Sequence, residues 1–108
     1  MPNCELAVVD SMKLRDYCLS PTHPRGRHKA RAFASSRGLS RADTEELRKA
    51  ILDAACNEDA RLGDLDAHGQ RYLIDFRMST AAGEATIRSA WIIRNGEEHP
   101  RFVTCYVR

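Results

Sequence analysis

The sequence of 108 residues has no long apolar segment. Its only apolar run near the N-terminus is Leu6-Ala7-Val8-Val9. A secretory signal needs an apolar core of about 7–15 residues, and a membrane-spanning helix needs about 20. We therefore expect a soluble, cytoplasmic protein that contacts no membrane. A segment released from a larger exported toxin would have the same composition.

Cysteine is scarce and scattered. The chain has Cys4, Cys18, Cys56 and Cys105, with no Cys-x-x-Cys spacing. This pattern gives little support to a zinc site. The even number permits two disulfides, but without a secretion signal we expect reduced thiols that are buried as ordinary core residues.

Signatures of cofactor chemistry are missing as well. The sequence has no Walker loop, no dinucleotide-binding fingerprint and no nucleophile elbow. Asp64, Asp66 and Asp75 lack the clustering that a metal site requires. We expect a protein that uses neither a metal ion nor another cofactor.

Acidic residues are absent from one long stretch. Between Tyr17 and Ala42 the chain has six Lys or Arg residues, two His and no Asp or Glu. The whole chain has 17 basic and 15 acidic residues, so the remainder has 11 basic and 15 acidic ones. The stretch therefore carries +6 and the remainder −4. Such a basic patch indicates RNA, another polyanion or an acidic protein as the partner.

The basic stretch also holds the best candidates for catalysis. His28 lies beside Lys29 and near Arg31, and nearby cations are expected to lower its pKa and favour the neutral base. Cleavage of RNA requires a base for the 2′-hydroxyl, an acid for the leaving oxygen and cations for the charged phosphorane. We assign the proton transfers to His28 or His23. The candidate phosphate-binding cations are Arg25, Arg27, Lys29 and Arg31. The alternative is that His28 and Arg31 belong to a solvated helix face.

The N-terminal region predicts an edge strand or an extended lead-in over 5–9 and then a helix over 11–19. Asp10 offers an N-cap oxygen, and the residues expected to face inward are Met12, Leu14, Tyr17 and Cys18.

Two more helices are expected over 26–38 and 40–56. The second of them starts with a capping-box-like Ser40 to Asp43 and is the most clearly marked element. Its apolar residues recur at helical spacing: Leu47, Ala50, Ile51, Ala54 and Ala55.

From Ala60 onward the apolar period changes to two, which is typical of strands. We expect strands over 61–65, 71–78, 85–94 and 101–107, separated by turns at His68-Gly69, 81–83 and Asn95-Gly96. The strand over 85–94 is apolar on both faces from Ala90 to Ile93, which indicates a central position.

The residues of the last strand alternate, which predicts that its two faces carry different side chains. Val103, Cys105 and Val107 alternate with a second set, Phe102, Thr104 and Tyr106. Thr104 and Tyr106 could orient a phosphate or stack on a base. The alternative is ordinary packing on the sheet surface.

These elements predict an α+β fold of one domain over 1–108. Two or three N-terminal helices would pack on one face of a C-terminal antiparallel sheet of about four strands. The opposite face, or a groove at the sheet edge, would carry the function.

Several runs give the chain a recognisable pattern: Leu6-Ala7-Val8-Val9-Asp10, Lys13-Leu14-Arg15-Asp16-Tyr17, His23-Pro24-x-Gly26-x-His28-Lys29-Ala30-Arg31-x-Phe33, Gly69-Gln70-Arg71-Tyr72, Ile87-Arg88-Ser89-Ala90-Trp91-Ile92-Ile93 and Pro100-Arg101-Phe102-Val103-Thr104-Cys105-Tyr106. Together they resemble a family of small bacterial proteins known as a domain of unknown function, found alone or at the C-termini of toxin-like proteins.

A looser resemblance, at the level of the fold, is to the barnase–EndoU–colicin–RelE group of ribonuclease toxins. That resemblance implies a helical segment ahead of an antiparallel sheet and a site of His, Arg, Lys, Thr and Tyr residues without metal. It would place His28, Lys29 and Arg31 near one end of the sheet, facing Arg88, Thr104 and Tyr106.

The leading hypothesis is a metal-independent ribonuclease of bacterial toxin type. Its catalytic residues would be His28, Lys29, Arg31, Thr104 and Tyr106, and its substrate-binding residues His23, Arg25, Arg27 and Arg88. A cognate antitoxin or immunity protein is a further expected partner. The alternative is a non-catalytic module that binds an acidic protein through residues 25–31.

Overall fold

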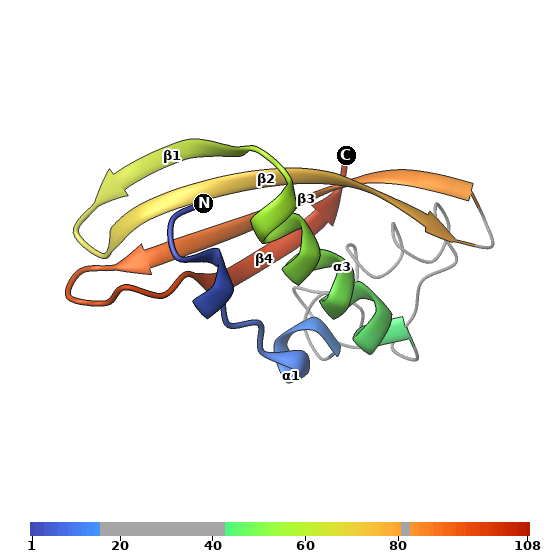
Figure 1. The fold of residues 1–108 in the computed structure, drawn as a ribbon, viewed down its shortest axis with the longest axis horizontal. Coiled ribbons are helices and arrows are strands. Elements are labelled where there is room, and N and C mark those ends of the chain that lie inside the picture. The colour runs from blue at the N-terminus through green and yellow to red at the C-terminus, as the bar shows by residue number, and fades with distance from the viewer. Residues whose placement is uncertain (16–42, 81–82) are drawn as a thin grey trace.

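A meander of four antiparallel strands forms the framework of the protein (Figure 1). The computed structural model describes residues 1–15, 43–80 and 83–108. The strands lie side by side in chain order: β1 (Ala60–Asp66), β2 (Gly69–Thr80), β3 (Gly83–Arg94) and β4 (Arg101–Val107). This arrangement confirms the predicted antiparallel sheet and the interior position of the strand over 85–94.

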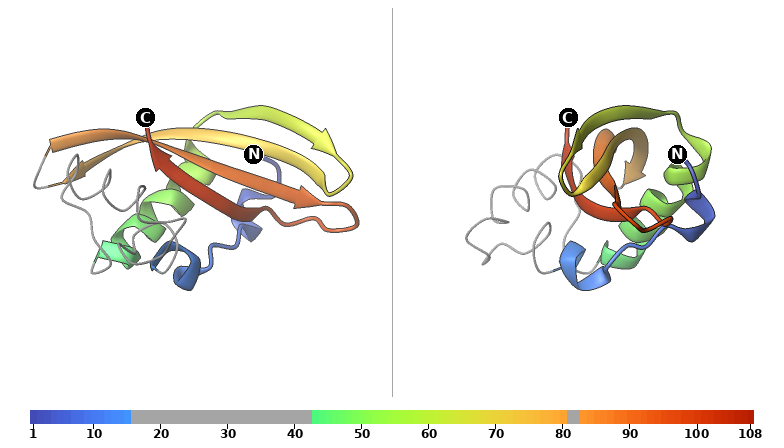
Figure 2. Two further views of the ribbon diagram at one scale, coloured as in Figure 1. Left: turned by 180° about the vertical axis from the view of Figure 1, so that it is seen from behind. Right: turned by 90° about the vertical axis from the view of Figure 1, so that its left-hand side faces the viewer.

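Helix α3 (Thr44–Asn57) lies across one face of the sheet (Figures 1 and 2). Its 3.6-residue period places the apolar residues on one side, and the helix packs against β2. The buried residues on that side include Leu47, Ile51, Ala54 and Ala55. Asp43 occupies the N-cap position, and the predicted start at Ser40 lies outside the described residues. The helix and its apolar side are confirmed.

The core lies between α3 and the facing side of the sheet. The strands contribute buried apolar side chains from alternate positions: Ile74, Phe76, Met78, Ala85, Ile87, Trp91, Phe102 and Cys105. The Trp91 and Phe102 rings meet edge to face, with their centroids 5.8 Å apart. Trp91 is completely buried, as predicted for a core residue.

The N-terminal segment departs from its predicted extended form. Cys4–Leu6 forms a 3-10 helix, η1, and only Val8 pairs with the sheet, in a single parallel bridge to Arg101. The expectation of a strand from residue 5 is therefore wrong. An apolar run of four residues does not by itself distinguish a strand from a helical turn.

The predicted start of the next helix is confirmed at Asp10. Its carboxylate accepts a hydrogen bond from the Met12 backbone N–H at 2.9 Å, ahead of α1 (Ser11–Lys13). Leu14 is fully buried, but Met12 is 60% exposed. The inward position predicted for Met12 is therefore wrong. The remainder of the predicted helix over 11–19 lies outside the described residues, as does the whole helix predicted over 26–38.

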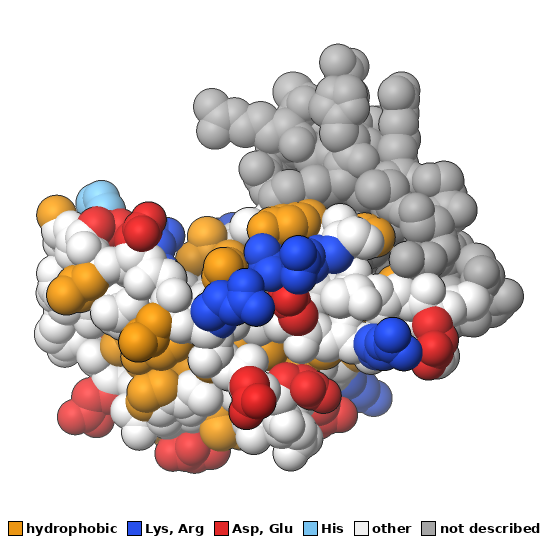
Figure 3. Space-filling model, turned by 90° about the horizontal axis from the view of Figure 1, so that it is seen from above, with side chains coloured by type: hydrophobic (Ala, Val, Ile, Leu, Met, Phe, Trp, Pro, Cys, Tyr) orange, Lys and Arg blue, Asp and Glu red, His pale blue; other side chains and the backbone are white. Residues whose placement is uncertain are grey.

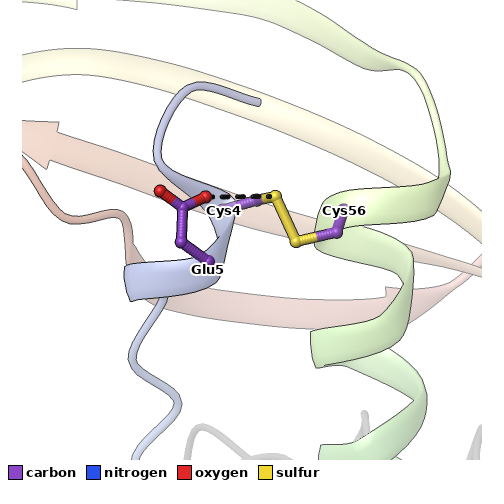
Figure 4. The surroundings of a disulfide bond; sticks show 3 residues. All are labelled: Cys4, Glu5 and Cys56. Carbon is purple, nitrogen blue, oxygen red and sulfur yellow. Dashed lines mark hydrogen bonds between the residues drawn. A yellow bond between two sulfur atoms is a disulfide. The ribbon is translucent and has the colours of Figure 1, made fainter.

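Two cysteines are joined, contrary to the expectation of reduced thiols. Cys4 in η1 and Cys56 in the last turn of α3 form a disulfide with their Cα atoms 5.2 Å apart (Figure 4). The sequence does not reveal that these two cysteines are close. They are 52 residues apart, and they meet only because η1 packs beside α3. Cys105 is buried as predicted, and Cys18 lies outside the described residues.

A β-bulge changes the predicted faces of the last strand. The pairing of β3 with β4 shifts between Ala90 and Trp91, so Val103 is an extra residue on β4. Phe102 and Cys105 are consequently both buried on the side of α3. The prediction that Phe102 shares a face with Thr104 and Tyr106 is wrong for this reason.

No helix in the described part of the chain is long and apolar enough to cross a membrane.

Candidate functional site

Polar side chains gather on the face of the sheet that points away from α3, here called the outer face. Because strand side chains alternate, the residues between the buried positions of β2 and β3 belong to this face. The register places Asp75 opposite Arg88 and Arg88 opposite Tyr106. Thr104 is paired with Ala90, so it lies one outward position away from Tyr106.

Arg88 and Asp75 form a two-pronged ion pair. Arg88 Nε donates to Asp75 Oδ1 at 2.7 Å, and Arg88 NH2 donates to Oδ2 at 3.0 Å. Arg108 NH1 donates to the same Oδ2 at 2.8 Å. The side chains of Arg88 and Asp75 are only 15% and 28% exposed. These contacts, together with the partial burial, hold the Arg88 guanidinium in one orientation.

Asp75 and its two arginine partners stabilise the ionised forms of one another. The hydrogen bond from Arg88, followed by that from Arg108, holds the pKa of Asp75 below its ordinary value of 3.8. The hydrogen bond to Asp75, followed by the one to the Tyr106 side chain, raises the pKa of Arg88. At neutral pH two guanidiniums therefore face one carboxylate, which leaves one positive charge available to an anion.

A pocket of about 360 Å³ opens beside this group. The described residues that line it are Glu58, Asp59, Ala60, Arg61, Leu73, Asp75 and Arg88. Figure 3 shows this side of the molecule, where basic side chains gather around an acidic one in the middle of the view. The Arg88 and Arg61 side chains make the pocket suitable for a phosphate or carboxylate group.

The chemistry available in this pocket is binding and charge stabilisation. Its described lining includes no histidine, so a general base would come from another segment. Among residues 1–15, 43–80 and 83–108, no group of three or more His, Cys, Asp or Glu side chains is placed to hold a metal ion.

The structure brings together three of the residues predicted for the site. Arg88, Thr104 and Tyr106 occupy outward positions on the neighbouring strands β3 and β4. Their functional roles stay predictions. The other six predicted site residues lie outside the described part of the chain: His23, Arg25, Arg27, His28, Lys29 and Arg31.

Sequence reasoning missed Asp75 and Arg108. The pairing of Asp75 with Arg88 follows from a hairpin in which Thr80 pairs with Gly83. The turn expected at 81–83 would instead pair residue 75 with residue 89, and a slip of one residue moves a side chain to the other face. Arg108 follows the last strand, and no sequence pattern indicated its contact with Asp75.

Comparison with protein families gives one assignment. A family model described as a domain of unknown function, DUF6883, matches residues 1–108. No curated protein matches the chain.

Comparison with solved structures supports the fold. The chain is similar to a chain in a structure titled contact-dependent growth inhibition toxin–immunity protein complex, from Klebsiella pneumoniae 342. The TM-score is 0.67 with 17% sequence identity, and the match covers 94% of this chain and 99% of the other.

Proposed function

The chain belongs to the DUF6883 family of domains of unknown function, and we propose that it is the ribonuclease of a bacterial toxin system. The observation that carries the proposal is the Arg88 guanidinium, fixed by Asp75 at 2.7 and 3.0 Å beside an open pocket. A cation that is held in place before the substrate binds stabilises a developing phosphorane better than a mobile one.

Each residue has a defined part in this proposal. Arg88 binds the phosphate that is cleaved, and Asp75 is a positioning residue that orients Arg88. Tyr106 is paired with Arg88 across β3 and β4, and with Thr104 it orients the sugar–phosphate backbone. His28 removes the proton of the 2′-hydroxyl, which attacks the neighbouring phosphorus. His23 protonates the leaving 5′-oxygen, and neither step needs a metal ion.

The partners follow from this role. The similar solved structure is titled as a toxin–immunity protein complex, which supports a cognate immunity protein for this chain. The cytoplasm of a target cell is the compartment in which RNA would be cleaved. Lys29 and Arg31, with Arg25 and Arg27, would bind the RNA backbone next to the cleaved bond.

The test is inducible expression in bacteria followed by measurement of growth and total RNA integrity. We expect the wild type to arrest growth and fragment RNA, and His28→Ala and Arg88→Gln to abolish both effects. Arg77→Gln is the matched control, because Arg77 lies on the same sheet, in β2, but its side chain is 78% exposed and its ion pair with Glu84 is long, at 3.8 Å. It should behave as the wild type.

Two results would overturn the proposed ribonuclease activity. Normal growth with intact RNA in the wild-type strain, with the protein present in soluble form, would show that it does not cleave RNA in cells. Fragmentation that persists in both His28→Ala and Arg88→Gln would show that the activity lies elsewhere in the chain.

A non-catalytic interaction module is the second candidate, and one observation favours it. Leu62 and Leu65 on the edge strand β1 are 70% and 74% exposed, and exposed leucines on an edge strand suit a protein partner. In this case binding to an immunity protein would survive His28→Ala. It would fail on charge reversal at Arg27 and Arg31 or on Leu62→Ser with Leu65→Ser.

A further inference from the structure

A second and larger pocket lies at the other end of the outer face. Its volume is about 690 Å³, within the usual range of roughly 300–1,000 Å³ for ligand sites. The described residues that line it are Val8, Asp10, Lys13, His68, Arg71, Ile92, Arg94, Arg101, Phe102 and Val103. We call it the N-terminal pocket, because residues 8–13 form one of its walls.

The register shows why these residues meet. Arg71 is paired with Ile92, and Ile92 with Arg101, so the three form one row across β2, β3 and β4. Val8 continues the row, because it bridges to Arg101. The pocket therefore has an apolar floor at Ile92 with basic side chains on either side.

The charge balance of the pocket favours an anion. Four cations line it: Lys13, Arg71, Arg94 and Arg101. Three carboxylates lie in or beside it, namely Asp10, Asp66 and Glu97. Four positive and three negative charges leave +1. Among the described residues, the Lys13 side chain makes no hydrogen bond or ion pair, so its ammonium group remains available to a ligand.

Two of the arginines are held in place. Arg101 NH2 donates to Glu97 Oε2 at 2.8 Å, while Arg71 Nε donates to Asp66 Oδ2 at 2.9 Å. Each guanidinium retains further N–H groups, because it carries five donors. Guanidiniums fixed in this way lose little freedom when they bind a phosphate.

The apolar part of the pocket suits the rest of a nucleotide. Val8 is about half exposed, and it lines the pocket with Ile92 and Val103. Aliphatic side chains of this kind provide a surface for the flat face of a base, while the surrounding cations bind its phosphate.

We propose that the N-terminal pocket binds a nucleotide of the RNA strand at a distance from the bond that is cleaved at Arg88. This inference rests on the proposed ribonuclease function and adds a second binding site for the same substrate. Arg71 and Asp75 lie four residues apart on β2, which corresponds to about 13 Å. A stacked single strand with about 3.4 Å per phosphate covers this distance in about four nucleotides.

The test measures binding of a fluorescent 2′-O-methyl oligoribonucleotide, which lacks the hydroxyl required for cleavage. Binding is followed by anisotropy over a range of salt concentrations. We expect Lys13→Gln with Arg71→Gln to weaken binding by about tenfold and to reduce the slope of log K against log salt by about 1.4, or 0.7 per lost contact. With cleavable RNA, the same variant should raise KM while kcat stays near the wild-type value.

The matched control is Lys49→Gln with Arg77→Gln. It removes the same two charges from exposed positions outside the pocket and should leave both affinity and slope nearly unchanged. Lys13→Gln alone is the second variant if the double variant is unstable, because the Lys13 side chain has no described partner to lose.

The outcomes separate this inference from the nuclease itself. The inference would be overturned if the pocket variant and the control lost the same affinity for the oligonucleotide, or if the pocket variant lost none. A polyglutamate probe that binds as tightly as the oligonucleotide would also overturn it, in favour of an acidic protein. If the wild type binds RNA through the pocket but never cleaves it, the pocket stands and the proposed nuclease fails.

Discussion

Asp75 and Arg88 face each other across β2 and β3, and two parallel hydrogen bonds of 2.7 and 3.0 Å join their side chains. The pair lies on the outer face, where Tyr106 of β4 is paired with Arg88 and Arg108, just after β4, donates to Asp75. Its partial burial strengthens the electrostatic interaction relative to a fully hydrated pair. The same contact therefore contributes to the stability of the sheet and to the orientation of Arg88.

Replacement of Asp75 should destabilise the protein. Asp75→Asn removes the charge that both Arg88 and Arg108 use, and it leaves the Arg88 guanidinium partly buried without its counter-ion. We expect the free energy of unfolding to fall by about 1–3 kcal/mol. Urea unfolding of the two proteins at neutral pH measures this difference.

The control for that experiment is Glu84→Gln. It breaks the ion pair with Arg77, whose two side chains are 78% and 63% exposed at a distance of 3.8 Å. Exposed pairs of this kind contribute little to stability. A loss in Asp75→Asn no larger than that in Glu84→Gln would show that the Asp75 pair has no special role.

The contribution of Asp75 to the free energy of unfolding should depend on pH. Hydrogen bonds from Arg88 and Arg108 hold its pKa below 3.8 in the folded protein, whereas the unfolded carboxyl returns to the ordinary value. As the pH falls through about 4, the unfolded chain takes up this proton first, so the free energy of unfolding decreases. The stabilisation by Asp75 is fully present above about pH 4 and is lost as the pH falls through the lower pKa of its carboxyl in the folded protein.

The measurement compares urea unfolding of the wild type and Asp75→Asn at about pH 6, 4 and 2.5. The difference in stability should be largest near pH 6 and should shrink at the most acidic point. Other carboxylates, such as Glu97 and Asp66, titrate in both proteins and cancel from the comparison. A difference that stays constant over this range would contradict the assignment.

The sheet could be predicted from the sequence because its signals are local. Alternation of apolar residues over β2 and the apolar centre of β3 follow directly from the two-residue period of strands. Gly69 marks a turn correctly: its φ is 148°, and a Cβ there would clash with the Ile93 carbonyl oxygen. The helical period of α3 is equally local, and Ile51 is one of its completely buried residues.

The features that could not be predicted depend on contacts between distant segments. The bulge at Val103 shows itself only in the register with β3, and it reverses the face of Phe102. The disulfide requires η1 to lie beside the last turn of α3. At the site, outward alternation was sufficient to group Arg88 with Thr104 and Tyr106, but the contact of Arg108 with Asp75 depends on how β4 ends.

The disulfide between Cys4 and Cys56 should make a large contribution to stability. It closes a loop with a sequence separation of 52, and the loss of chain entropy in the unfolded state corresponds to about 4 kcal/mol. We expect Cys4→Ser with Cys56→Ser to lower the unfolding midpoint in urea, and dithiothreitol to lower that of the wild type to a similar degree.

The double variant also provides the control for the reductant. Dithiothreitol should leave its unfolding midpoint unchanged, because the variant lacks this disulfide. If the wild type has the same midpoint with and without reductant, while mass analysis confirms the oxidised state, the bond contributes nothing to stability.

Ser89 should be essential for the packing around Trp91. Its hydroxyl donates to the Ile74 carbonyl oxygen at 3.0 Å and accepts a hydrogen bond from Trp91 Nε1 at 3.0 Å, and both side chains are completely buried. Ser89→Ala leaves the indole N–H buried without this acceptor, so we expect a loss of about 1–3 kcal/mol. Because Trp91 is the only tryptophan in the sequence, its fluorescence reports on this site directly, and the emission should change in the folded variant.

Ser79→Ala is the matched control: Ser79 is exposed and its hydroxyl contacts Glu84 at 3.3 Å. Equal stability of the two variants, with unchanged emission, would show that the Ser89 hydroxyl is dispensable to the core.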